Sequence, residues 1–360
     1  MISEKRFLSP KKWDALLKTL SFKLPTSVVG HSILKQPIYA HQLGKGPVKV
    51  LMWSQMHGNE STTTRALLDL FNHLHSPQGA ELLKGLTLMI IPQLSPDGAD
   101  AYTRVNANGV DLNRDAQDLT QPESVALNAV FEHFAPHFCF NLHGQRTIFA
   151  AGKKGQPATL AFLSPAADED RTLTKARIKA MQLIAAINED LQKDIPHQIG
   201  RYDDIFNPNC VGDRFTSLGV PTILYEAGHY EMDYDRNFTK EMILKSLRVG
   251  LNSIYTASYK NHSVDDYHKI PENQKDYVDI IVENIDIKTE NGLFKNQELA
   301  LQYKEEKKER SVLFTPICHS FSQKLDLLAH RRARANEIFS FSNLNFSPNQ
   351  SIEISKKRLF

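Results

Sequence analysis

The sequence has few cysteines, no long hydrophobic run and almost no excess of charge. Its three cysteines, Cys139, Cys210 and Cys318, are far apart and odd in number, so they predict neither a disulfide framework nor a thiolate metal cage. We expect buried free thiols. The formal net charge of +2 excludes the broad basic surface of a nucleic-acid-binding protein. No run approaches the roughly 18 apolar residues that a membrane-spanning helix requires.

The first twenty residues, MISEKRFLSPKKWDALLKTL, lack the uninterrupted apolar core of a secretory signal. We therefore predict a cytoplasmic protein, with neither a membrane nor a nucleic acid as its partner. Hydrophobic residues at 41% and charged residues at 23% are ordinary for a globular chain. A length of 360 residues allows one large domain with an appendage, or two domains. The sequence does not indicate an oligomeric state.

Apolar runs of strand length alternate with segments of helical periodicity. Pro37–Leu43 and Val48–Ser54 are joined by Gly-Lys-Gly, which predicts a hairpin. Other expected strands are Leu86–Pro92, Phe138–Leu142 and Pro221–Tyr225. The expected helices are Ser9–Leu20, Ser61–Leu74, Pro122–Phe134, Arg171–Asp194 and Phe238–Tyr255. This pattern predicts an α/β fold with a mixed, mainly parallel twisted sheet flanked by helices.

A histidine and a carboxylate follow the strand expected at Val48–Ser54. His57 and Glu60 lie just past its carboxyl end, which is the edge where ligands bind in open α/β sheets. A His-x-x-Glu spacing can direct an imidazole nitrogen and a carboxylate oxygen onto one point. The pair is half of a zinc site, although this short pattern alone arises often by chance.

Two later strands end in residues that complete such a site. His143 directly follows Phe138–Leu142, and Glu226 closes Pro221–Tyr225. Catalytic zinc commonly has three protein ligands, and His, Glu and His form one of the known sets. A carboxylate at the end of a buried strand is costly unless it is used or paired. We therefore predict His143 as the third ligand and Glu226 as a general base.

The most polar stretch of the chain, from Ser95 to Gln117, contains Arg104 and Arg114 among several asparagines. Long irregular loops inside compact domains are usually functional. A guanidinium binds a carboxylate through two parallel hydrogen bonds, so this stretch is suited to an anion. A solvated connection is the alternative that the residues alone leave open.

Taken together, these pieces resemble the zinc carboxypeptidase family, typified by carboxypeptidase A. Four segments match in order: His57-Gly-Asn-Glu60, the block from Arg104 to Arg114, Asn141-Leu-His143, and Tyr225-Glu226. The run Asn-Gly-Val-Asp-Leu-Asn-Arg inside the second segment is the most specific. The resemblance spans roughly residues 30 to 258.

The resemblance implies a metal site and a catalytic pair. His57, Glu60 and His143 would bind one zinc ion per chain. Glu226 would be the general acid/base that activates a water molecule, and Arg104 would stabilise the negative charge that develops on the carbonyl oxygen.

The resemblance also implies a substrate-binding set. Asn113 and Arg114 would receive the terminal carboxylate of the substrate. Tyr202 would be the mobile tyrosine that closes over the substrate, or only a loop aromatic, because its distance in sequence from Glu226 differs from the usual one. Asp115 stands where many members of the family have asparagine, so the local pocket is expected to differ.

The function that follows is zinc-dependent hydrolysis of an amide bond next to a free carboxylate. The substrate would be a peptide, as for a carboxypeptidase, or a murein peptide, as for the bacterial cytoplasmic amidases. The alternative is an N-acyl amino acid hydrolase like succinylglutamate desuccinylase and aspartoacylase, which share the His-Gly-Asn-Glu form. A non-catalytic binding module on this fold is a further alternative. The preferred side chain or acyl group is not readable.

We predict two regions, a catalytic domain at residues 1–258 and an accessory α+β region at residues 259–360. The second region has short apolar runs at Val278–Val282 and Ser311–Ile317. Its charge run from Lys304 to Arg310 is interpreted as solvated surface. The role of this region is not readable from its sequence.

Overall fold

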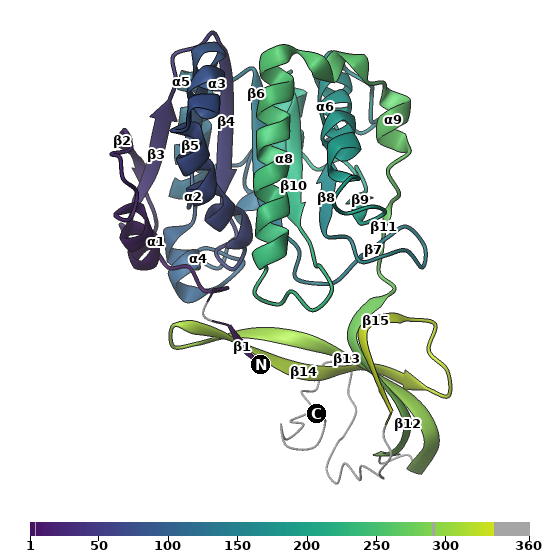
Figure 1. Cartoon of the computed structure of the whole chain (residues 1–360). Coiled ribbons are helices and arrows are strands. Elements are labelled where there is room, and N and C mark those ends of the chain that lie inside the picture. The colour runs from purple at the N-terminus through teal and green to yellow at the C-terminus, as the bar shows by residue number, and fades with distance from the viewer. Residues whose placement is uncertain (4, 290–291, 335–360) are drawn as a thin grey trace.

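An eight-stranded sheet with helices on both faces forms the larger part of the computed structural model, which describes residues 1–3, 5–289 and 292–334 (Figure 1). The strands are, in sheet order, β2 (Thr26–His31), β3 (Pro37–Leu43), β5 (Leu86–Ile91), β4 (Val48–Ser54), β6 (Phe138–Gly144), β10 (Thr222–Ala227), β8 (Leu160–Leu163) and β9 (Ile199–Arg201).

The centre of this sheet is parallel and its flanks contain antiparallel pairs. β5, β4, β6 and β10 run parallel to one another, and β8 runs parallel to β9. β2 with β3, β3 with β5, and β10 with β8 are antiparallel. The predicted mixed, mainly parallel sheet flanked by helices is confirmed.

The predicted hairpin between Pro37–Leu43 and Val48–Ser54 is wrong. β3 pairs with β2 and β5, whereas β4 lies between β5 and β6. The Gly-Lys-Gly segment crosses the start of β5 instead of forming a two-strand turn, because Gly46 N donates to Leu86 O at 3.2 Å. The two glycines of this segment are compatible both with a hairpin turn and with the connection that the structure shows.

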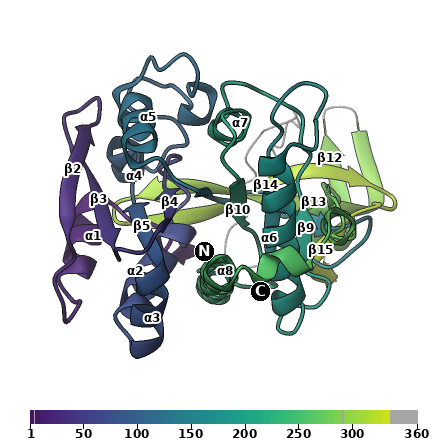
Figure 2. The ribbon, with the colours of Figure 1, turned by 90° about the horizontal axis from the view of Figure 1, so that it is seen from above.

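The helices form two layers, which Figure 2 shows on opposite sides of the sheet. One layer contains α1 (Pro10–Leu17), α2 (Thr62–Leu74), α3 (Pro77–Gly85), α6 (Lys175–Leu191), α8 (Asn237–Thr256) and α9 (Val264–His268). The other contains α5 (Pro122–Phe134) and α7 (Val211–Ser217). Shorter elements are α4 (Pro96–Ala101) and the 3-10 turns η1 (Leu112–Arg114) and η2 (Ser258–Asn261). No helix among the described residues is long and apolar enough to span a bilayer.

The alternation of side chains along β6 determines which layer faces the predicted site. Phe140 and Leu142 are part of the core beneath α2 and α8, whereas Cys139 belongs to the core beneath α5 and α7. Because successive side chains in a strand point to opposite faces, His143 points to the same side as Cys139. The predicted site residues on β6 therefore face the α5–α7 layer.

A second, five-stranded sheet lies across one end of the larger unit (Figure 1). Its order is β1 (Ile2–Ser3), β14 (Ser311–Ser322), β13 (Gly292–Lys308), β12 (Tyr277–Thr289) and β15 (Leu328–Arg334). A small ladder between β7 (Ala150–Ala151) and β11 (Asn273–Gln274) precedes it. Residues from the start of the chain thus complete a sheet built mainly from its later part. The division at residue 258 stays a prediction, and residues 335–360 lie outside the described part.

The two units meet through a buried ion pair. Arg6 Nη2 lies 2.9 and 3.0 Å from the two carboxylate oxygens of Glu305, and the Tyr102 hydroxyl donates to Glu305 Oε2 at 2.7 Å. The interpretation of the charge run around Glu305 as solvated surface is wrong at this position, because Glu305 is buried. Its partner Arg6 comes from the other end of the sequence, where no local pattern could have indicated it.

Candidate metal and active site

The first half of the candidate metal site is a tight turn after β4. Gln55, directly after this strand, has φ 43°, and Glu60 N donates to His57 O at 3.1 Å. Gly58 lies between the two candidate ligands, where a Cβ atom would be 1.8 Å from the carbonyl carbon of Gly98. Only glycine permits this approach of α4 to the turn, which explains why position 58 is a glycine.

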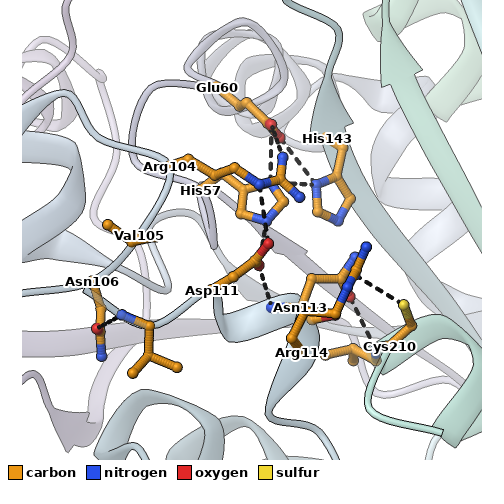
Figure 3. Close-up of polar contacts among 12 residues, drawn as sticks. His57, Glu60, Arg104, Val105, Asn106, Asp111, Asn113, Arg114, His143 and Cys210 are labelled. Atoms are coloured by element: carbon orange, nitrogen blue, oxygen red, sulfur yellow. Dashed lines mark hydrogen bonds and ion pairs between the residues drawn. The ribbon is translucent and has the colours of Figure 1, made fainter. Parts of the chain in front are cut away.

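The side chains of His57, Glu60 and His143 converge on one point (Figure 3). His57 Nδ1 is 2.9 Å from Glu60 Oε1, His143 Nδ1 is 3.0 Å from Glu60 Oε2, and the two Nδ1 atoms are 3.2 Å apart. Gly144 N also donates to Glu60 Oε2 at 3.1 Å. All three side chains are buried.

These separations fit a small tetrahedral cation. Nitrogen and oxygen ligands about 2.0 to 2.1 Å from a tetrahedral zinc ion are about 3.3 Å from one another. The three observed separations lie between 2.9 and 3.2 Å, close to that value. The residues present therefore fit zinc, with the fourth position left for water or substrate.

The charges of the cluster also suit a cation. Burial alone would lower the pKa of His57, but the carboxylates of Glu60 and Asp111 outweigh it and raise the pKa to about 9. Burial would raise the pKa of Glu60, but the neighbouring histidines hold it well below its usual range. Burial lowers the pKa of His143. One carboxylate and one neutral imidazole are thus ready to bind a metal, and His57 would release its proton on binding.

Asp111 is a further candidate residue of this site that the sequence pattern did not indicate. Its Oδ1 atom lies 2.9 Å from His57 Nε2 and accepts from Asn113 N at 2.9 Å. A carboxylate on the outer nitrogen of a metal-binding histidine fixes the orientation and tautomer of the ring. Asp111 is the only carboxylate between Arg104 and Arg114, so that position in the motif was the available signal.

Arg104 is held beside the cluster by the same aspartate. Its Nε donates to Asp111 Oδ2 at 3.0 Å, and its Nη1 is 3.6 Å from Glu60 Oε1 (Figure 3). Its side chain keeps 44% of its surface exposed. The guanidinium therefore lies next to the candidate metal position and is accessible to a bound molecule.

Glu226 lies on the strand next to the one that carries His143. In the parallel pairing of β6 and β10, Glu226 is directly opposite His143, so both side chains project from the same face. Its Oε2 atom is shielded from solvent and has no hydrogen-bond partner among the described residues. Burial raises the pKa of Glu226 well above its usual range, and the charge of Glu60 raises it further. A cation bound to the cluster would oppose both effects.

Asn113 and Arg114 lie on η1, against the start of α7. Asn113 Oδ1 accepts from Val211 N at 3.0 Å, and Arg114 Nη1 is 3.0 Å from Cys210 Sγ. Arg114 is exposed, and within the described part of the chain it forms no ion pair with a carboxylate. Burial raises the pKa of the Cys210 thiol to about 11, so Cys210 is a neutral neighbour of Arg114.

Tyr202 follows β9 and packs edge-on against Phe149, with ring centroids 5.5 Å apart. Burial raises the pKa of its phenol, and the charge of Glu226 raises it further. The phenol is therefore close enough to Glu226 to respond to its charge. Its role as the closing tyrosine stays a prediction.

Part of the chain is similar to known proteins. Residues 12–148 match the family model described as zinc carboxypeptidase. A probable carboxypeptidase 2 of Arthroderma benhamiae is 30% identical over 113 residues, which are 30% of this chain and 21% of that protein. The chain thus spans about a fifth of the length of this curated relative.

Solved structures show the same fold. A metallo-carboxypeptidase of Pseudomonas aeruginosa in complex with (2-guanidinoethylmercapto)succinic acid has a TM-score of 0.55 at 16% identity, covering 69% of each chain. Carboxypeptidase A of Helicoverpa armigera has a TM-score of 0.55 at 16% identity, covering 71% of this chain and 75% of that one. At such identities the likeness concerns the fold.

Proposed function

Because residues 12–148 match the zinc carboxypeptidase family model, we propose that the protein is a zinc metallocarboxypeptidase that hydrolyses the amide bond next to a free carboxylate. The observation that carries this proposal is the convergence of His57, Glu60 and His143, with Glu226 directly opposite His143 on the adjacent strand. This arrangement joins a metal site to a shielded carboxylate, as hydrolysis of an amide requires.

His57, Glu60 and His143 would hold the ion. A zinc ion held there would lower the pKa of a bound water molecule and polarise the carbonyl of the scissile bond. Glu226 would take the proton of that water and deliver it to the leaving amine, and the pKa of Glu226 raised by burial suits a group that must both accept and donate. Arg104, held by Asp111, would face the negative charge that develops on oxygen. Preorganised stabilisation of this kind is commonly worth about 3 to 4 kcal/mol.

The substrate would be bound by its free carboxylate. Arg114 is exposed on the same loop as Asp111, and Asn113 ties that loop to α7. A guanidinium without a carboxylate partner in the described chain is suited to receive one from the substrate. Tyr202 would then contact the substrate from the side of β9.

The test is mass spectrometry of the products after the zinc-loaded protein meets one mixture. The mixture contains peptides with free and with amidated carboxyl termini, L-Ala-γ-D-Glu-diaminopimelate, and N-acyl amino acids. The control is Glu226→Gln, which keeps the shape of the side chain and removes the base. We expect the loss of one terminal residue from the free-carboxylate peptides alone.

Other outcomes would favour one of the alternative activities. Cleavage of the murein tripeptide alone would indicate an amidase. Cleavage of the N-acyl amino acids alone would favour a hydrolase like succinylglutamate desuccinylase. No product that depends on Glu226 would contradict the proposed enzyme and favour a binding role. The cytoplasmic location stays a prediction.

A further inference from the structure

The guanidinium of Arg236 lies at the point where β6 and β10 end. Their pairing stops at Gly144 and Ala227, one residue after His143 and Glu226. Arg236 Nη1 donates to Ala227 O at 2.8 Å and also to Gly228 O, and Nη2 donates to Gln145 O at 2.7 Å. One side chain therefore binds carbonyl groups from both strand ends.

Two of these carbonyl groups, those of Gln145 and Gly228, would otherwise be difficult to satisfy. Beyond Gly144 and Ala227 the two segments separate, and Gln145 N to Ala227 O, at 2.9 Å, is the last backbone hydrogen bond between them. Arg236 is 1% exposed, so water does not replace it at this place. Because an unpaired buried carbonyl group is costly, loss of the guanidinium would favour movement of the strand ends.

The residues on either side of Arg236 are fixed by three contacts. Asp233 accepts from Asn237 N at 2.9 Å at the start of α8. The Tyr234 hydroxyl donates to Asp279 of β12 at 2.8 Å. Arg65 of α2 donates to Asp235 O at 2.7 Å. The segment that carries Arg236 is thus held at the start of α8, by α2 and by the five-stranded sheet.

We propose that Arg236 is a positioning residue that fixes the end of β6 against the end of β10, and so His143 against Glu226. The proposal rests on the proposed function for its catalytic consequence. Arginine is required because its planar fork binds separate acceptors in fixed directions, whereas the lysine ammonium is a single point on a flexible stem. A misplacement of about 1 Å can cost about a hundredfold in rate, so a small shift between the two strands is sufficient.

The experiment compares wild type, Arg236→Lys and Arg6→Lys, all loaded with zinc. Arg6 is the matched control because it is also a buried arginine at the contact with the five-stranded sheet, but it binds Glu305 and Tyr234 O instead of the strand ends. For Arg236→Lys we expect kcat to fall about 10- to 100-fold, KM to stay within about threefold, and one zinc to remain bound. Arg6→Lys keeps a cation beside Glu305 and leaves the hydrogen bonds of Tyr102 and Tyr234 to the five-stranded sheet in place, so it should lower Tm without this selective loss of kcat.

Hydrogen exchange measured by mass spectrometry provides a readout that does not need activity. Arg236→Lys should speed exchange in peptides that cover residues 142–146 and 226–229, and Arg6→Lys should not. Unchanged exchange, unchanged kcat, or an equal fall of kcat in both variants would each overturn the proposal. If the wild type cleaves no substrate, the proposed function fails, and exchange alone decides whether Arg236 holds the strand ends.

Discussion

Replacing Asp111 by asparagine should weaken zinc binding, and by an amount that depends on pH. Asp111 Oδ1 orients His57 through Nε2 at 2.9 Å, and Oδ2 binds Arg104 Nε at 3.0 Å. Asparagine keeps one acceptor for His57 but presents an NH2 group to the Arg104 donor. The ring of His57 would therefore lose both its charged partner and a fixed partner orientation.

The magnitude follows from the two roles of the carboxylate. Loss of a carboxylate behind a metal-binding histidine commonly costs about 10- to 100-fold in metal affinity. The same carboxylate helps to raise the pKa of His57 to about 9. Below that pKa, wild-type zinc affinity falls about tenfold for each pH unit, since His57 must first lose its proton. In the variant the pKa of His57 is lower, so this fall begins at a lower pH.

The assay is chelator competition for zinc between about pH 6.5 and pH 9, with wild type, Asp111→Asn and Arg104→Gln. We expect Asp111→Asn to bind zinc about 10- to 100-fold more weakly than wild type near pH 9, and this difference in zinc affinity to become smaller as the pH falls. Arg104→Gln should stay within about threefold of wild type, which excludes an effect that acts through Arg104. Equal affinities near pH 9, or a gap that widens toward acid, would refute this reasoning.

Three other changes have defined outcomes. Glu226→Gln should abolish turnover while one zinc stays bound, because Glu226 is opposite His143 but outside the ligand cluster; retained turnover would remove it from its role. Arg114→Ala should raise KM for substrates with a free carboxylate and leave amidated analogues unaffected; an equal effect on both would contradict carboxylate binding. Burial raises the pKa of Asp279 to about 6. The folded state therefore binds more protons than the unfolded state between about pH 4 and pH 6. The free energy of unfolding falls as the pH rises through that range. Asp279→Asn should therefore gain up to about 3 kcal/mol in free energy of unfolding relative to wild type between pH 4 and pH 7 in urea titrations; a constant difference would show that folding does not raise the pKa of Asp279.

The ends of the strands were predictable because each strand sequence is apolar where it is buried and becomes polar where the candidate site residues begin. Val48–Ser54 is apolar where it is covered on both faces, and it becomes polar only at the turn that contains His57. β6 has the same pattern, with His143 near its end. Parallel strands end at a common edge, so ligands from distant segments were expected to meet. The edge strand β2 has mostly exposed or half-buried residues, and its sequence therefore carried no comparable signal.

What the sequence could not predict are polar residues whose partners come from elsewhere in the fold. Asp111 stood in the motif, but its bond to His57 joins residues 54 positions apart. Arg236 precedes a helix in an ordinary polar loop, and only the folded chain brings it to Gln145, 91 positions away. Glu305 is one carboxylate in a run of charged residues, and the partner that pairs with it in the buried position is Arg6, from the other end of the chain. Periodicity indicates which face is buried, but it does not indicate which buried charge has a partner.

The five-stranded sheet contacts both loops that flank the candidate site, which gives it a physical role beyond covering apolar surface. Glu305 binds Tyr102, two residues before Arg104, and Asp279 binds Tyr234, two residues before Arg236. Each contact is a hydrogen bond to a buried carboxylate, and its loss would remove a donor from an acceptor that water does not reach. The sheet thus holds the two loops in one relative position. One of these loops carries Arg104, and the other carries Arg236, which binds the ends of β6 and β10. The position of Arg104 relative to these strand ends therefore depends on a sheet that contains none of the proposed catalytic residues.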